Sequence, residues 1–156
     1  MDTNWARMDP VASSLKVTDA ICMLDLCVWL ARWQMERGNY FFIEHPFTAK
    51  AWSRANVQAL AELPGVKKSV FDQCQFGLVT KINKDAMKKR TIILSNMESF
   101  YERFNGRLCD KQHAHVTVAG TEGGERRSTH AQRYPRELCN ALAECIRKQL
   151  STDNDN

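Results

Sequence analysis

Several hallmarks of common protein classes are missing from this chain of 156 residues. Its apolar runs are all shorter than the roughly 18 residues that a membrane span needs. Residues 1–12 carry charges and are not followed by the apolar segment of a secretory signal. These absences predict an intracellular protein, cytoplasmic or nuclear, that does not act in a membrane.

Glycine is scarce as well. The seven glycines form neither a Gly-x-Gly-x-x-Gly turn nor a P-loop, the motifs with which doubly wound domains cradle a cofactor phosphate. We therefore do not expect a cofactor-binding half of that kind. The chain is long enough for one domain with one core and too short for two. We place that domain at residues 13–150, with flexible termini at residues 1–12 and 151–156.

Cysteine is not scarce, but its six residues do not predict disulfides. A chain without a secretory signal is expected to keep its thiols reduced. Four cysteines fall in segments expected to be helical, where a free cysteine serves as a small buried hydrophobe. They are Cys22, Cys27, Cys139 and Cys145.

The hydrophobic pattern predicts alternating helices and short strands. The longest helix is expected at 13–38, where apolar residues recur at spacings of three and four between a serine and a glycine. Further helices are expected at 48–63, at 96–104 and after residue 134, strands at 40–43, 66–71, 78–82, 91–94 and 116–118, and a mobile loop at 120–130. This order predicts an α/β fold, a three-layer Rossmann-like partial sheet flanked by helices.

The stretch from Tyr40 to Ile43 is expected to lie in the middle of the sheet. It is aromatic and β-branched and is bounded by glycine and proline, as in a strand that is buried on both faces. Glu44 and His45 follow directly, so the strand would deliver them to a crevice at its carboxyl end as candidate catalytic residues. The alternative for Glu44 is a carboxylate that accepts hydrogen bonds from backbone N–H groups at the strand end.

Positive charge is concentrated in one stretch, although the net charge of the chain is only +4. Between residues 81 and 90, five basic residues stand against one acidic residue. A solvated loop would explain such a run, and contact with the phosphates of DNA or RNA is the functional alternative. The candidate nucleic-acid contacts are Lys81, Lys84, Lys88, Lys89 and Arg90.

Residues 109–115 hold a candidate metal site, because Cys109, His113 and His115 lie on one short irregular segment. Zinc prefers about four nitrogen or sulfur ligands. Cys74 follows an earlier strand and could supply the fourth ligand from across the sheet, which would give a closed structural site. The alternative is one buried thiol beside surface histidines that mark the start of a strand. A thiolate–imidazole pair of Cys109 and His113 for hydrolysis is the least supported option.

Several short motifs follow one another in a characteristic order. They are Glu44-His45-Pro46, Trp52, Asp72 to Gly77, Lys89 to Thr91, Ser95-Asn96, Cys109 with His113 and His115, and Tyr134-Pro135 with Leu138-Cys139. This order, over residues 20–147, resembles the C-terminal part of cytosine-5 DNA methyltransferase-like domains of the kind found in phage proteins and retroelement polyproteins. The resemblance implies a Rossmann-like fold, and it implies that Glu44 binds the ring of a flipped cytosine.

The same resemblance implies two parts that this chain lacks, a Pro-Cys nucleophile and a glycine-rich loop for S-adenosylmethionine. We therefore expect a half-domain that is not active alone and serves as a nucleic-acid-associated module of a mobile element or phage-like protein. Another segment of a larger polyprotein is a candidate partner. Two alternatives stay open: a DNA cytosine methyltransferase completed by another chain, which alone would use S-adenosylmethionine, and a zinc-stabilised structural interaction domain.

Overall fold

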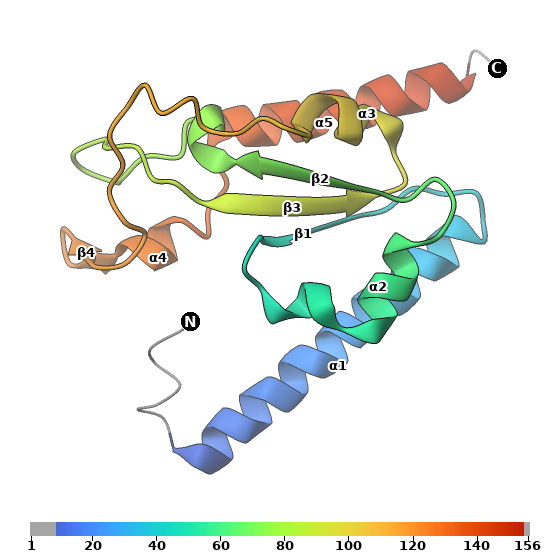
Figure 1. Cartoon of the computed structure of the whole chain (residues 1–156), viewed down its shortest axis with the longest axis horizontal. Coiled ribbons are helices and arrows are strands. Elements are labelled where there is room, and N and C mark those ends of the chain that lie inside the picture. The colour runs from blue at the N-terminus through green and yellow to red at the C-terminus, as the bar shows by residue number, and fades with distance from the viewer. Residues whose placement is uncertain (1–8, 155–156) are drawn as a thin grey trace.

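The computed structural model describes residues 9–154 and has a small antiparallel sheet between two layers of helices (Figure 1). Helices α1 and α2 lie on one face of the sheet, and α3 and α5 lie on the other. In chain order the elements are α1 (Pro10–Met35), β1 (Phe42–Pro46), η2 (Lys50–Ser53), α2 (Ala55–Ala61), β2 (Lys67–Asp72), η3 (Gln73–Phe76), β3 (Arg90–Ser95), α3 (Glu98–Phe104), β4 (Thr121–Glu122), β5 (Glu125–Arg126), α4 (Arg127–His130) and α5 (Arg136–Asn154). The expected combination of helices and strands is confirmed, with helices on both faces of the sheet. The expected Rossmann-like arrangement is not confirmed, because neighbouring strands of the sheet are antiparallel.

The strand order of the main sheet is β1-β3-β2, and β3 runs antiparallel to both neighbours. Strands β1 and β2 are therefore parallel to each other, and the connection between them carries α2. The expectation that residues 40–43 form the middle of the sheet is wrong. Strand β1 begins at Phe42 and lies at an edge, and the centre is β3, in which Thr91 to Ser95 are all buried.

Alternate side chains of β3 supply two separate cores. Ile92 and Leu94 pack with Phe41 and Trp52 under α1 and α2. Ile93 faces the opposite side, where it joins an aromatic cluster with α3 and α5. The cluster consists of Phe71, Phe76, Phe100 and Phe104, whose neighbouring ring centroids are 5.0–5.7 Å apart. A core on each face of the sheet explains why the central strand β3 is apolar on both sides.

Two expected helices begin or break elsewhere. Helix α1 starts at Pro10 because the side chain of Asp9 accepts a hydrogen bond from the backbone N–H of Val11, so the expected serine cap near residue 13 is not used. The expected helix at 48–63 consists of a short 3-10 turn, η2, followed by α2. In the described part of the termini that we expect to be flexible, residues 10–12 and 151–154 are helical. Residues 1–8 and 155–156 lie outside the residues that the structure describes.

The region between β2 and β3 and the region before α5 differ most from expectation. The expected strand at 78–82 is wrong, since only a single bridge joins Val79 to Ala86. The expected strand at 116–118 is likewise reduced to one bridge, between Met87 and Val116. Residues 120–130, expected to be a mobile loop, instead contain the hairpin β4–β5 and helix α4. The two-glycine turn between β4 and β5 is typical of tight hairpins.

The cysteines expected to be buried in helices divide unequally. Cys145 is buried against α3, whereas Cys22, Cys27 and Cys139 are exposed, so burial was correctly predicted for one of the four. Within residues 9–154, no helix combines the length and the apolar composition that crossing a membrane requires.

Candidate metal centre and basic groove

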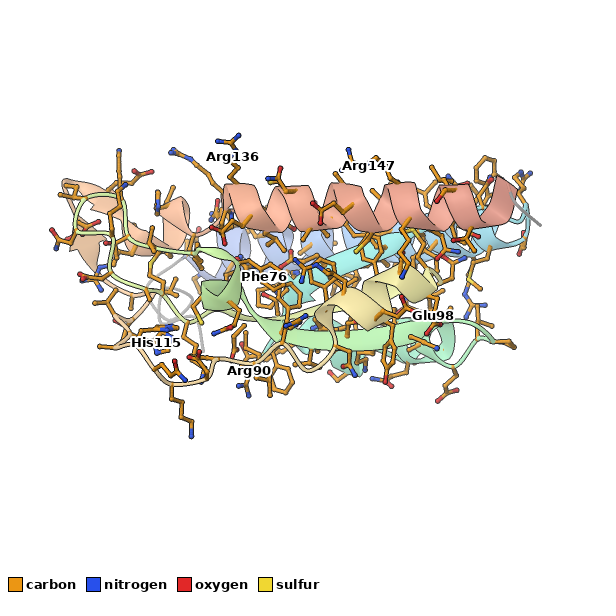
Figure 2. All side chains as sticks on the ribbon, turned by 90° about the horizontal axis from the view of Figure 1, so that it is seen from above. Phe76, Arg90, Glu98, His115, Arg136 and Arg147 are labelled. Atoms are coloured by element: carbon orange, nitrogen blue, oxygen red, sulfur yellow. The ribbon has the colours of Figure 1, made fainter. Side chains whose placement is uncertain are left out.

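Four metal-ligand side chains come together where β2 ends. Cys74 lies in η3, directly after β2, and Cys109, His113 and His115 lie in the segment that follows α3. The ligand atoms of all four lie within 4.8 Å of one another. In Figure 2, His115 lies on the side of the domain opposite Arg136 and Arg147 of α5. The expected grouping of Cys74 with the other three is confirmed, and this cluster could hold a metal ion.

The distances from Cys109 to the two histidines fit a tetrahedral ion. The Sγ atom of Cys109 lies 3.6 Å from Nε2 of His113 and 3.5 Å from Nε2 of His115. With zinc bonds of about 2.3 Å to sulfur and 2.0–2.1 Å to nitrogen, two ligands at a tetrahedral angle lie about 3.5 Å apart. Both histidines present the same ring nitrogen to the thiol. A hydrolytic thiol–imidazole pair needs only one imidazole beside the thiol. Two imidazoles at the same sulfur therefore favour a metal centre over a hydrolytic pair.

The backbone around Cys109 is held in a tight turn. The Sγ atom of Cys109 accepts a 3.3 Å hydrogen bond from the backbone N–H of Lys111, which has a φ of 63°. The carboxylate of Asp110 accepts a 3.0 Å hydrogen bond from the N–H of Gln112 and lies 3.8 Å from Nδ1 of His113. A carboxylate behind a histidine is a common arrangement around metal ligands.

The protonation of Cys74 depends on whether the cluster holds a metal ion. Burial raises the pKa of the Cys74 thiol to about 12, and the hydrogen bond that this thiol makes to Cys109 and the charges of Cys109 and Asp72 add to the effect. A bound cation reverses this effect, because a coordinating thiol is deprotonated by the charge of the metal. Metal binding at this cluster would therefore release protons.

Asp72, the last residue of β2, lies between the cluster and the basic stretch. Its side chain is fully buried. Oδ2 accepts a 3.0 Å hydrogen bond from the backbone N–H of Cys109, while Arg90 donates from Nε to Oδ1 at 3.0 Å and from Nη2 to Oδ2 at 3.1 Å. Burial alone raises the pKa of Asp72, but these hydrogen bonds and the charges of Arg90 and Lys88 outweigh it and hold the pKa below its usual value.

The five expected nucleic-acid contacts divide into two groups. Lys81 forms an ion pair with Glu125, and Nζ of Lys84 donates to the backbone carbonyl of Lys81. The other three residues line one open groove of about 660 Å³ beside Phe47. They are Lys88, Lys89 and Arg90, joined by Pro46, Thr48, Val118, Ser128, Ala131 and Gln132.

Glu44 and His45 are not brought together. Successive side chains of a strand point to opposite faces. The ring of His45 lies edge-on to Trp52 under the α1 side of the sheet, with centroids 6.3 Å apart. On the other face, Oε2 of Glu44 accepts a 2.6 Å hydrogen bond from Tyr134, and Oε1 lies 3.4 Å from Nε2 of Gln73. Among residues 9–154, these partners of Glu44 are side chains, so the backbone alternative for this carboxylate is wrong.

Sequence reasoning missed the roles of Asp72 and Tyr134. Both residues belong to the motifs quoted above, but neither was assigned a contact. The role of Asp72 could have been predicted from its position at the end of an expected strand, because a buried carboxylate there needs hydrogen-bond donors. The partner of Tyr134 is 90 residues away, and no local pattern indicates it.

No known family model, curated protein or solved structure matches this chain. The fold and the site therefore define only a class: a mixed α/β domain with a two-cysteine, two-histidine cluster beside a basic groove.

Proposed function

We propose that the protein is a zinc-stabilised, nucleic-acid-associated α/β module that is not an enzyme by itself. The observation that supports zinc is the convergence of two thiols and two imidazoles within 4.8 Å. Zinc suits this donor set, and four protein ligands leave no coordination position for a catalytic water. The ion would have a structural role, since it would tie η3 to the segment after α3.

Metal analysis of the purified protein tests this proposal. The wild type should contain about one zinc per chain, and Cys109→Ser should lose most of it. Cys139→Ser is the matched control, because this exposed thiol lies on α5 outside the cluster. Less than a tenth of an equivalent of zinc in wild-type protein purified without chelator, and no uptake on reconstitution, would remove the proposal.

A specific observation favours nucleic acid as the ligand of the groove. Two lysines and an arginine line it together with Phe47, which is 45% exposed. The guanidinium of Arg90 lies 5.8 Å from the ring centroid of Phe47. Positive side chains beside an exposed aromatic ring suit single-stranded nucleic acid, in which phosphates meet the cations and a base stacks on the ring. Undetectable affinity for single-stranded and duplex DNA at 50 mM salt would contradict this role.

Methyl transfer is a second candidate for an assembly in which another polypeptide supplies the nucleophile and the S-adenosylmethionine loop. It is supported by β1 and β2, which are parallel and linked through a helix as in a Rossmann-like domain, although β3 separates them. Glu44 would be the residue that binds the base. Methyl transfer to DNA by the completed assembly, abolished by Glu44→Gln, would support this candidate over the structural one.

A further inference from the structure

Asp72 contacts the proposed metal centre and the proposed nucleic-acid groove at once. Its Oδ2 atom receives the backbone N–H of the metal ligand Cys109, and both of its oxygens receive the guanidinium of Arg90, which lines the groove. Lys88 also lines the groove, and its Nζ lies 4.0 Å from Oδ2. This distance is too long for a hydrogen bond. Two sites that are separate in sequence thus share one carboxylate.

The burial of Asp72 makes this arrangement sensitive to either site. A buried carboxylate is costly unless charged or N–H donors satisfy it, so each of its partners matters more than on the surface. If Cys109 moves, Oδ2 loses a donor. Lys88 is the nearest cation that could replace this donor, and a move of less than about 1 Å would bring it within hydrogen-bond range.

We propose that Asp72 couples the two sites, so that an ion held by Cys109 keeps Lys88 and Arg90 available to the nucleic-acid phosphates in the groove. This inference rests on the proposed function. With the ion in place, the Cys109 N–H stays on Oδ2, and Lys88 stays in the groove. Arg90 has five N–H donors and gives two of them to Asp72, so the others remain for a phosphate. Without the ion, the Cys109 segment is released and Lys88 turns toward Asp72.

Coupling of this kind must be reciprocal: zinc strengthens DNA binding, and DNA strengthens zinc binding by the same factor. The probe is a fluorescein-labelled 12-nucleotide oligothymidylate at 50 mM salt, whose anisotropy is measured with zinc-loaded and chelator-treated protein. We expect the zinc-loaded protein to bind at least about fivefold more tightly, the lower end of ordinary allosteric coupling. Zinc affinity measured against a competing chelator, with and without the oligonucleotide, should give the same ratio.

Asp72→Asn is the decisive variant, because it leaves all four ligands and all three cationic groove residues in place. It should still bind one zinc. The ratio of its oligonucleotide affinities with and without zinc should fall to about one. Glu122→Gln is the matched control: like Asp72, the Glu122 carboxylate accepts hydrogen bonds from the backbone, here from the N–H groups of Ile82 and Asn83, but it does not join the two sites. The ratio should be unchanged in this variant.

Chelation could also weaken DNA binding by unfolding the protein, and Lys88→Gln separates that effect from coupling. This variant keeps the hydrogen bonds of Asp72 to Cys109 and Arg90 but removes the cation that turns toward Asp72 when the ion is lost. A ratio that survives in Lys88→Gln, or in a folded Asp72→Asn, would overturn the inference. Zinc and oligonucleotide that bind wild type independently would overturn it too while leaving the proposed function intact. Absence of zinc or of DNA binding would remove the proposed function and this inference together.

Discussion

Tyr134 donates a 2.6 Å hydrogen bond from its hydroxyl group to Oε2 of Glu44, and so joins the segment before α5 to the edge strand β1. The other carboxylate oxygen of Glu44 faces Gln73, which donates a 3.0 Å hydrogen bond to Thr91 of β3. Oε1 of Gln73 is buried without a hydrogen-bond partner among the described residues. The edge strand β1 is thus held by polar contacts to η3 and to the segment before α5, as well as by its pairing with β3.

Removal of this hydroxyl group should destabilise the domain. Tyr134→Phe keeps the ring and deletes the donor to a carboxylate, so we expect a loss of about 1–2 kcal/mol in the free energy of unfolding, measured in urea. Tyr101→Phe is the control, because within residues 9–154 the hydroxyl of Tyr101 makes no hydrogen bond. An equal effect of both substitutions would contradict this account of the contact.

The same contact predicts a loss of stability at alkaline pH. Burial, and then the hydrogen bond and charge of Glu44, raise the pKa of Tyr134 above its ordinary value of 10.0. The folded state therefore holds this proton more tightly than the unfolded state. Stability from this group is complete below about pH 10 and falls as the pH rises beyond it. Urea unfolding between pH 9 and pH 11 should show a shallower decline in Tyr134→Phe than in wild type.

Salt dependence separates the two groups of basic residues. Lys88→Ala should reduce the slope of log affinity for DNA against log salt by about 1, because one phosphate contact is lost. Lys84→Ala is the control, since Nζ of Lys84 is bonded to the carbonyl of Lys81 and lies outside the groove lining. A slope reduced equally by both would assign the binding to the diffuse charge of the whole stretch.

Gly77 should be important for the metal centre because it ends the turn that carries Cys74. It has a φ of 79°, and a Cβ added there would lie 3.3 Å from the carboxylate of Glu137. Gly106 has a similar φ of 76° but open space around it. Gly106→Ala should therefore cost about 1 kcal/mol for backbone strain alone. Gly77→Ala should cost more than that in urea and should also weaken zinc binding, whereas Gly106→Ala should not.

The metal cluster could be predicted from the sequence because three of its ligands lie within seven residues and the fourth follows a recognisable strand. Strand β3 was predicted because it contains a short apolar run, and β2 was predicted from Val66, Val70 and Phe71 although Lys67 and Lys68 interrupt the apolar residues. The position of β1 could not be predicted from such a run. Phe41 packs under α1 while Tyr40 packs with the opposite core, so an edge covered by helices on both faces has the same composition as a central strand.

The remaining errors arise from contacts between distant segments. Residues 78–82 have the composition of a strand, but Glu122, 40 residues further on, accepts the N–H groups of Ile82 and Asn83, while only Val79 forms a bridge. The basic stretch is continuous in sequence, yet Glu125 and Asp72 pair with different parts of it. The density of charge along the sequence does not predict which cations form ion pairs with a carboxylate from a distant segment.

The central claim is that Cys74, Cys109, His113 and His115 together hold one zinc ion. X-ray absorption at the zinc edge of the purified protein tests it most directly. The account predicts two sulfur neighbours at about 2.3 Å and two nitrogen neighbours at about 2.0–2.1 Å, and only one sulfur in Cys74→Ser. A coordination shell of oxygen and nitrogen without sulfur, or a shell unchanged by Cys74→Ser, would contradict it.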